Sequence, residues 1–210
     1  MRGQADSPFA PGTALDEPLI VEDALQLLAH VEPQRPVFAG LSIGGLYAAR
    51  TWALGGQAEG LVLINTLRKD GPRLRWQNDA VLRAVQVGGL PLLGDLFSQL
   101  LWGEPWLEAN RPNFLGEGGY TPLPKEAGHY NLLDNARSAD WDLHYERFEI
   151  PVLVVTGQQD HVFYEPATVD ELFARMPNAR RVDIPDGGHM LPVEKPEALS
   201  GALLDFAKSL

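Results

Sequence analysis

The chain has 210 residues, of which 45% are hydrophobic and 21% are charged, and its 17 basic and 28 acidic residues give a formal net charge of −11. This length predicts one domain with a hydrophobic core, and the composition is too apolar for intrinsic disorder. An acidic surface argues against nucleic acid as a partner, because polyanion binding needs clustered basic side chains. The absence of cysteine excludes disulfides, thiolate metal sites and a cysteine nucleophile, and it is compatible with a cytoplasmic location.

The first elements follow from proline, glycine and hydrophobic spacing. Residues 1–20 are rich in proline and glycine and are predicted to be a loop. From Val21 to Leu28 apolar residues recur at i, i+3, i+4 and i+7, which predicts a helix that ends at the turn of residues 32–36. Residues 37–41 are a short apolar run typical of a strand buried on both faces, and Ser42 links them to a helix over residues 46–53.

The rest of the chain continues the alternation of strand and helix after one long interruption. Apolar runs at 60–65 and 151–156 predict two further strands, a third is predicted at 180–184, and periodicity predicts helices over residues 169–176 and 199–210. Non-alternating apolar strands separated by helices predict an α/β fold with a mostly parallel sheet. Residues 69–148 hold four of the five tryptophans and are predicted to form a helical cap, so that residues 1–68 and 149–210 form the core.

No membrane segment or secretory signal is predicted. The charge-free stretch 36–49 is 14 residues long, whereas a bilayer span needs roughly 20 apolar residues. The first residues are polar and interrupted by proline, so they lack the apolar region of a signal peptide.

A serine between the first predicted strand and its helix carries the strongest chemical signal. Residues 40–44 read Gly-Leu-Ser-Ile-Gly, the G-x-S-x-G pattern that exposes a nucleophilic serine on a strained strand-to-helix turn. Gly40 and Gly44 lie two positions from Ser42 on either side, where a Cβ is expected to make the strand and the helix collide. The alternative is a serine that only completes a glycine-rich turn.

A serine nucleophile needs a base, and the base needs an orienting carboxylate. Five histidines are available: His30, His129, His144, His161 and His189. His189 follows the last predicted strand and Asp160 follows the strand before it, so loops at the carboxyl edge of the sheet can bring both to Ser42. Asp186 competes with Asp160 for the role of the acid, although its place just before His189 favours a turn. A structural loop histidine and a turn-forming aspartate are the alternatives.

Three segments in this order resemble the α/β-hydrolase superfamily: GLSIGG at 40–45, PVLVVTGQQDHVF at 151–163 and IPDGGHMLPVEKPEAL at 184–199. The resemblance covers nearly the whole chain and implies a cofactor-free hydrolase of a carboxylic ester or a lactone. It implies that Ser42 is the nucleophile, His189 the general acid and base, and Asp160 the orienting acid. The backbone N–H of Ile43 would donate to the oxyanion. The family's alternative acid position holds Asn65, which favours Asp160.

The resemblance also implies an N-terminally truncated chain. Residues 2–8 are similar to the family's arginine-glycine loop after its fourth strand, so four strands and one helix, roughly 60 residues, are expected to be missing. The missing part normally supplies a second oxyanion donor through a His-Gly pair, which this sequence lacks. The strand at 37–41 would become an exposed edge that favours a homo-oligomer. The second hypothesis is therefore a truncated, weak or inactive homologue that acts by binding or oligomerisation.

The remaining motifs leave some alternatives open. Ser42 stands where a dinucleotide-binding G-x-G-x-x-G needs glycine, and no H-E-x-x-H spacing occurs, so we predict no cofactor and no metal. The expected partner is a small ester-like molecule. Aromatic residues within 69–148 favour either an apolar acyl pocket or the cap's own core. A haloalkane dehalogenase is disfavoured because it would need an aspartate at Ser42, whereas a carbon–carbon bond hydrolase or a cofactor-free peroxidase stays open.

Overall fold

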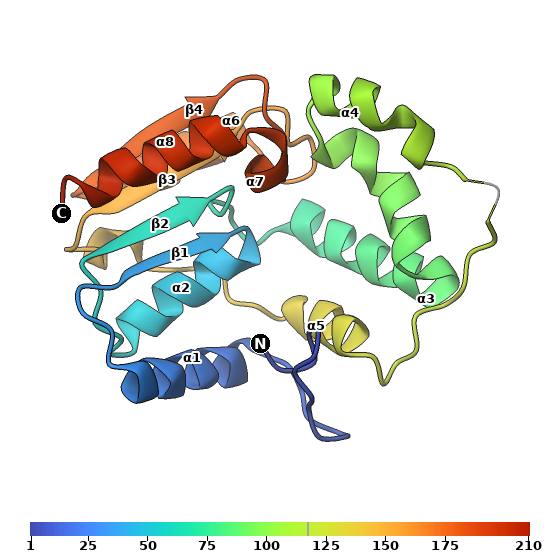
Figure 1. Cartoon of the computed structure of the whole chain (residues 1–210), viewed down its shortest axis with the longest axis horizontal. Helices are drawn as coiled ribbons and strands as arrows, with labels where there is room; N and C mark the ends of the chain where they lie inside the picture. Colours follow the sequence, from blue (N-terminus) through green and yellow to red (C-terminus); the bar gives the residue numbers. More distant parts are fainter. Residues whose placement is uncertain (117) are drawn as a thin grey trace.

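The computed structural model describes residues 1–116 and 118–210 and contains a sheet of four parallel strands (Figure 1). The strands lie side by side in their order along the chain, β1-β2-β3-β4, which confirms the predicted parallel α/β architecture. The elements in chain order are α1 (Glu17–Val31), β1 (Val37–Leu41), α2 (Ile43–Ala53), β2 (Gly60–Ile64), α3 (Pro72–Leu101), α4 (Glu104–Asn110), η1 (Arg111–Asn113), α5 (Gly128–Ala136), η2 (Tyr145–Arg147), β3 (Val152–Gly157), α6 (Pro166–Ala174), β4 (Ala179–Ile184), α7 (Leu191–Glu194) and α8 (Pro196–Ala207).

Helix α1 starts earlier than the hydrophobic spacing predicts. The prediction of a loop through residue 20 is wrong for residues 17–20, which are helical. Asp16 caps the helix, because its Oδ1 accepts a hydrogen bond from the Leu19 N–H at 3.1 Å. Pro18 stands in the first turn, where a missing N–H removes no helical hydrogen bond. The N-cap residue Asp16 therefore starts the helix before its apolar face begins.

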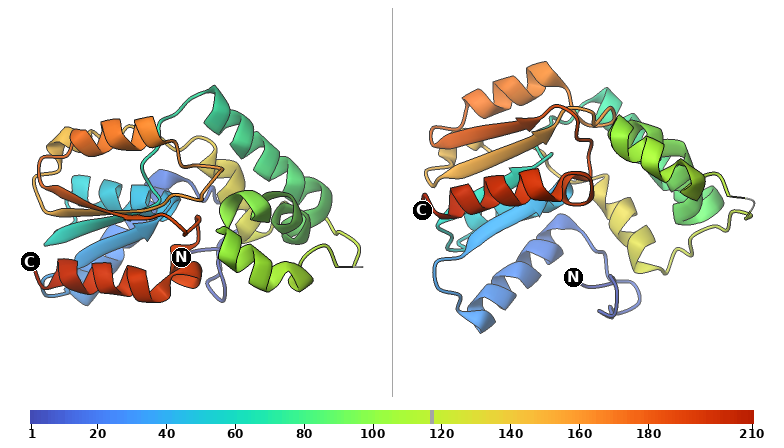
Figure 2. Two further views of the ribbon diagram at one scale, coloured as in Figure 1. Left: turned by 90° about the horizontal axis from the view of Figure 1, so that it is seen from above. Right: turned by 45° about the horizontal axis from the view of Figure 1, so that its top comes forward.

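The two faces of the sheet are covered by different helices. Leu61 and Leu63 of β2 point to the face that packs against α1, α2 and α6. Val62 and Ile64 point to the opposite face, which packs against α7 and α8. Figure 2 shows α6 and α8 on opposite sides of the strands. Strands β2 and β3 are buried along their whole length, as the non-alternating apolar runs predict.

Strand β1 is an edge strand of the described sheet, because it pairs only with β2. The prediction that this strand is buried on both faces is wrong, since its residues are half-buried or exposed and Val37 is 37% exposed. An edge strand leaves a row of backbone groups without a strand partner.

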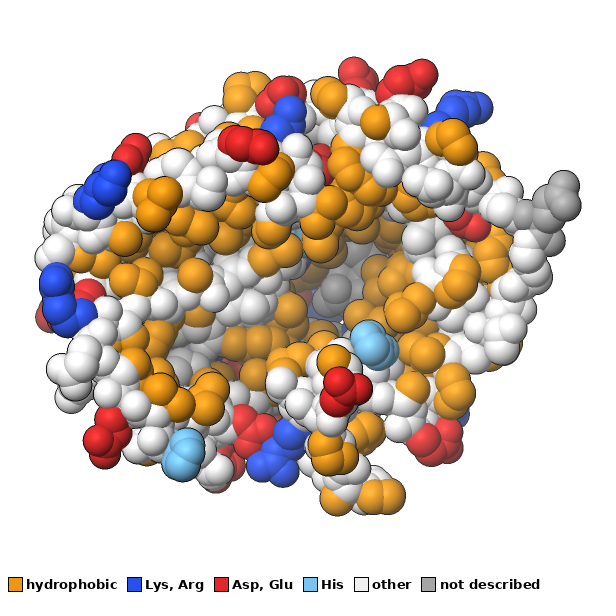
Figure 3. All heavy atoms as spheres, viewed as in Figure 1, with side chains coloured by type: hydrophobic (Ala, Val, Ile, Leu, Met, Phe, Trp, Pro, Cys, Tyr) orange, Lys and Arg blue, Asp and Glu red, His pale blue; other side chains and the backbone are white. Residues whose placement is uncertain are grey.

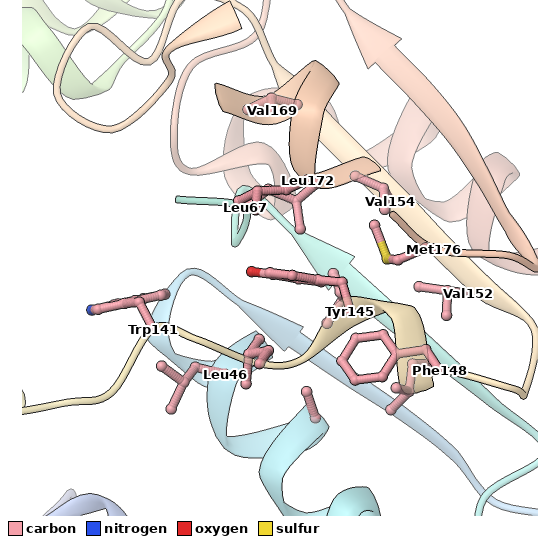
Figure 4. Packing of buried hydrophobic residues seen from close by; sticks show 14 of the residues in the cluster. Leu46, Leu67, Trp141, Tyr145, Phe148, Val152, Val154, Val169, Leu172 and Met176 are labelled. Atoms are coloured by element: carbon pink, nitrogen blue, oxygen red, sulfur yellow. The ribbon is translucent and has the colours of Figure 1, made fainter. Parts of the chain in front are cut away.

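Between β2 and β3 the described residues form the helices α3, α4, η1, α5 and η2, which are joined by loops and include no strand. Helix α3 is kinked at Gly89, where φ is 70°, just before Pro91. Val85 of α3 packs against Tyr130 of α5 in a small cluster of its own. At the end of the predicted cap, Trp141, Leu143, Tyr145 and Phe148 instead join the main core beside α2 and β3 (Figure 4). The division into core and cap stays a prediction.

Helix α3 is long and apolar enough to cross a membrane by length and composition alone, which the prediction of no membrane segment overlooked. Its break at Gly89 separates two shorter helical pieces, each below the roughly 20 residues of a bilayer span.

Candidate active site

Ser42 lies on a strained turn between β1 and α2. Its φ of 55° and ψ of −122° are unusual for a residue with a Cβ. The turn is held from the neighbouring strand, because the Ser42 N–H donates to the Ile64 carbonyl at 2.7 Å and the Thr66 hydroxyl donates to the Ser42 carbonyl at 3.1 Å. This strain is what a nucleophile elbow requires to project the side chain at the carboxyl edge of the sheet.

The structure confirms the steric reason for one of the two predicted elbow glycines and contradicts it for the other. A Cβ at Gly40 would lie 2.1 Å from the Gly44 backbone. A Cβ at Gly44 would meet no heavy atom within 4 Å, so the predicted collision there is wrong. The second close approach is at Gly45, where a Cβ would lie 2.0 Å from Thr66 Oγ1. The contact comes from the loop after β2, which sequence spacing around Ser42 does not show.

Asp160 and His189 lie together in the interior. Asp160 Oδ2 is 2.5 Å from His189 Nδ1, and the two residues are 1% and 7% exposed. Asp160 Oδ1 also accepts the N–H groups of Val162 and Phe163, at 3.1 and 3.0 Å, so the carboxylate is held on both oxygens. A proton on Nδ1 facing this carboxylate leaves Nε2 as an acceptor, the form a general base needs. Asp186 is instead exposed and pairs with Lys195 at 2.5 Å, which lowers its pKa.

Two further side chains hold the loop that carries His189, and the sequence analysis assigned neither this role. Asn65 Nδ2 donates to the carbonyls of Gly188 and His189, at 3.1 and 2.8 Å, and its Oδ1 accepts from the Gly157 N–H at 2.7 Å. Glu194 accepts the N–H groups of Gly103, Gly188 and Met190, at 2.7, 2.8 and 2.9 Å. The loop is thus held between β2, β3 and the start of α4.

Arg68, which the sequence analysis missed, contacts the candidate nucleophile directly. It is 6% exposed, and its Nη2 donates to Ser42 Oγ at 3.0 Å and to the Asn65 carbonyl at 2.7 Å. The guanidinium lies over the rings of Trp141, at 4.5 Å, and Phe163, at 4.1 Å. Burial lowers the pKa of Arg68 to about 10, so the side chain keeps its charge at neutral pH. A cation four residues after a buried strand was its only sequence signal.

The structure gathers Ser42, Asp160 and His189 at the carboxyl ends of β1, β3 and β4. Within the described residues no hydrogen bond joins Ser42 Oγ to the His189 ring, since the Ser42 hydroxyl faces Arg68. The Phe163 ring contacts both the His189 ring, at 5.0 Å between centroids, and the Arg68 guanidinium, at 4.1 Å. Ile43 is the first residue of α2, so its N–H has no intrahelical partner and is available to an oxyanion.

Several cavities border residues 69–148, the predicted cap. One of about 450 Å³ is lined by Arg68 and Phe163 and borders the candidate site. Another, of about 800 Å³, lies between α3 and α4 around Asp95 and Phe114, away from Ser42. Figure 3 shows the molecule hollowed between the sheet and the cap helices, with hydrophobic side chains gathered round the hollow. Trp102 and Trp106 stack on each other at 3.7 Å between centroids, so these two rings pack within the predicted cap.

None of the groups of histidine and carboxylate side chains in the described part of the chain is arranged to hold a metal ion.

Comparison with known proteins identifies the family of this chain. The model of the alpha/beta hydrolase family matches residues 1–202. The putative carbamate hydrolase RutD of Escherichia coli (strain K12 / DH10B) is 28% identical over 131 residues, 61% of this chain and 48% of the relative. The chain thus spans about half the length of the curated relatives it matches.

Solved structures extend the likeness over the whole chain. A thermophilic esterase from Thermogutta terrifontis shares 25% identity at a TM-score of 0.78, covering 100% of this chain and 78% of the esterase. The enol-lactonase from Burkholderia xenovorans LB400 shares 23% identity at a TM-score of 0.76, covering 99% of this chain and 78% of the lactonase. The chain belongs to the alpha/beta hydrolase family.

Proposed function

We propose that this chain is a serine hydrolase that cleaves a carboxylic ester or a lactone through an acyl-enzyme intermediate. The observation that carries the proposal is the buried pair of Asp160 and His189, 2.5 Å apart, at the same sheet edge as Ser42 on its strained turn. The likeness to an esterase and to an enol-lactonase supports the substrate class, and the likeness to a putative carbamate hydrolase supports attack on an acyl carbon.

In the proposed reaction Ser42 exchanges its hydrogen bond from Arg68 for one to His189 Nε2. Ser42 Oγ attacks the carbonyl carbon while its proton passes to Nε2, and Asp160 stabilises the imidazolium. The Ile43 N–H donates to the oxyanion. The ester C–O bond then breaks as the proton moves to the leaving oxygen. Water attacks the acyl-enzyme by the same path and releases the carboxylic acid and the serine.

Labelling with a fluorophosphonate probe tests this proposal, because the probe reacts only with an activated serine. We expect the chain to be labelled and the Ser42→Ala variant not to be labelled. Ser98→Ala is the control, since Ser98 lies in α3 away from the turn that carries Ser42, and its labelling should match that of the unchanged chain. A folded chain that is not labelled would contradict the proposal.

A second candidate is a catalytically weak or inactive homologue that acts by binding or by forming a homo-oligomer. Two observations favour it. Strand β1 is an edge strand of the described sheet, and Ile43 supplies the single oxyanion donor identified among the described residues. A missing donor typically costs about 10²–10³ in rate. Sedimentation velocity tests it: concentration-dependent association that Val37→Lys abolishes would support pairing through this edge, and a monomer at all concentrations would contradict it.

A further inference from the structure

Arg68 is a buried cation that makes no ion pair in the described part of the chain, although the nearby charge of Asp160 raises its pKa against the effect of burial. Two other largely enclosed arginines behave differently: Arg50 contacts Glu17 and Asp140, and Arg181 contacts Asp170 and Asp183. Burying a charge is costly unless it is paired and hydrogen-bonded. A site that keeps this charge unpaired beside a nucleophile is therefore suited to an anion that arrives with the substrate.

The Arg68 guanidinium is held in one plane and is only partly used. Its Nε and Nη2 donate to the carbonyls of Thr66 and Asn65, at 3.4 and 2.7 Å, and Nη2 also donates to Ser42 Oγ at 3.0 Å. The N–H groups of Nη1 have no acceptor among the described residues, and Nη1 is not a fully enclosed atom. The rings of Trp141 and Phe163 contact the guanidinium and fix its plane. One edge of a rigid fork is thus left for a ligand.

A second buried polar group has no partner in the same region. The Tyr145 hydroxyl is fully enclosed and makes no hydrogen bond within the described residues. In Figure 4 it points toward Leu67 and Trp141, and Trp141 is the residue whose ring Arg68 covers. Burial raises the pKa of Tyr145 well above its usual range, so the group stays a neutral donor. Because the Tyr145 oxygen is fully enclosed, Arg68 and not Tyr145 is the donor that a ligand can reach.

We propose that Arg68 selects substrates whose acyl part carries a free carboxylate, such as a half-ester of a short dicarboxylic acid. This inference rests on the proposed ester or lactone hydrolysis. The carboxylate accepts from Nη1 and Nη2 in the bidentate manner that arginine favours. Because Nη2 also reaches Ser42 Oγ, the carboxylate lies within a few bonds of the carbonyl carbon under attack. It draws the guanidinium away from Ser42 Oγ and frees that oxygen for His189.

A pair of matched esters tests the selection. Monoethyl succinate carries the carboxylate, and ethyl 4-methylpentanoate replaces it with an isopropyl group of similar shape. We expect kcat/KM for the charged ester to exceed that for the neutral one by about 10- to 100-fold, the range of a hydrogen-bonded charge. In Arg68→Met the two esters should have about equal kcat/KM, and in Arg68→Lys the preference for the charged ester should be smaller than in the unchanged chain. Arg75→Met, which removes an exposed arginine paired with Asp70, should leave it unchanged.

The ratio separates substrate selection from a general role in catalysis. An arginine that only stabilised the oxyanion would raise kcat/KM for both esters alike, so an equal loss for both in Arg68→Met would overturn the proposal. A chain that hydrolyses both esters equally would also overturn it. Arg68→Lys keeps the test decisive if Arg68→Met does not fold, because it retains a buried cation but not the planar fork.

Binding without turnover distinguishes this inference from the proposed function. Calorimetric titration of the Ser42→Ala variant with monoethyl succinate should detect binding, and Ser42→Ala combined with Arg68→Lys should bind at least about tenfold more weakly. If neither ester is hydrolysed but this difference is found, the hydrolase proposal fails and the carboxylate site stands. If the two variants bind the charged and neutral esters alike, the carboxylate site is refuted whether or not the chain is an enzyme.

Discussion

Replacing Asn65 by aspartate tests how the histidine loop is held. Aspartate has nearly the same shape and also tolerates a left-handed backbone, which Asn65 adopts with φ 47°. The change keeps an acceptor for the Gly157 N–H but replaces the amide donor by an oxygen that faces the carbonyls of Gly188 and His189. Backbone strain is thus matched, and only the hydrogen bonds and the charge differ.

The expected cost follows from those two carbonyls. A buried group left without its hydrogen bond costs about 1–3 kcal/mol, so Asn65→Asp should lower the free energy of unfolding by about 2–6 kcal/mol. Burial raises the pKa of the introduced carboxyl group, whose protonated form can donate again. The loss should therefore be complete above that raised pKa and should shrink as the pH falls toward the ordinary carboxyl value of about 3.9.

Urea unfolding followed by tryptophan fluorescence measures this loss at several pH values. Asn131→Asp is the matched control, because Asn131 is half-buried and donates to one backbone carbonyl, that of Thr13, at 2.8 Å. Its loss should be clearly smaller. Equal losses in the two variants, or a loss in Asn65→Asp that does not change with pH, would refute the idea that this amide holds the loop.

Three further variants test other contacts of the site. Gly45→Ala should lower the free energy of unfolding by about 1–3 kcal/mol, because its Cβ would lie 2.0 Å from Thr66 Oγ1. Gly44→Ala places its Cβ in open space and should raise the free energy of unfolding by about 0.5–1 kcal/mol. Equal effects of the two substitutions in urea unfolding would contradict this reasoning. Glu194→Gln should lower the melting temperature, with a loss of about 1–3 kcal/mol, since one oxygen that accepts two N–H groups is weakened; an unchanged melting temperature would count against it. Asp160→Asn should lower ester hydrolysis by about 10⁴-fold with little change in stability, and a loss under tenfold would speak against its proposed role.

The sequence predicts those features that depend on local pattern. Strands β1, β2 and β3 follow from apolar runs, and β4 continues the alternation of strand and helix. Parallel strands place their carboxyl ends at one edge, so the meeting of Asp160 with His189 could be anticipated from the strand that precedes each of them. The start of α1 was also present in the sequence, as Asp16 followed by Pro18, but the hydrophobic pattern alone passes over a cap.

The groups that the sequence did not reveal act over long distances along the chain. Asn65 contacts a loop more than 120 residues away, and nothing next to it in the sequence indicates that partner. Arg68 resembles any exposed cation at the end of a strand until Trp141 and Phe163 are seen to enclose it. The need for glycine at position 45 arises from Thr66, on the neighbouring strand's loop. Each is a property of packing between segments, which periodicity and spacing do not carry.

The predicted cap also has a direct part in placing the general base. The His189 N–H donates to the Leu101 carbonyl at the end of α3, at 2.5 Å, and Glu194 joins the same loop to Gly103 just before α4. A Cβ at Gly188 would lie 2.3 Å from the Leu101 carbonyl oxygen, so the loop and the cap are in close contact. The end of α3 therefore helps to hold His189 from outside the sheet, while Asn65 holds it from within. A change in the cap that moved Leu101 would alter the orientation of the base as well as the shape of the substrate cavity.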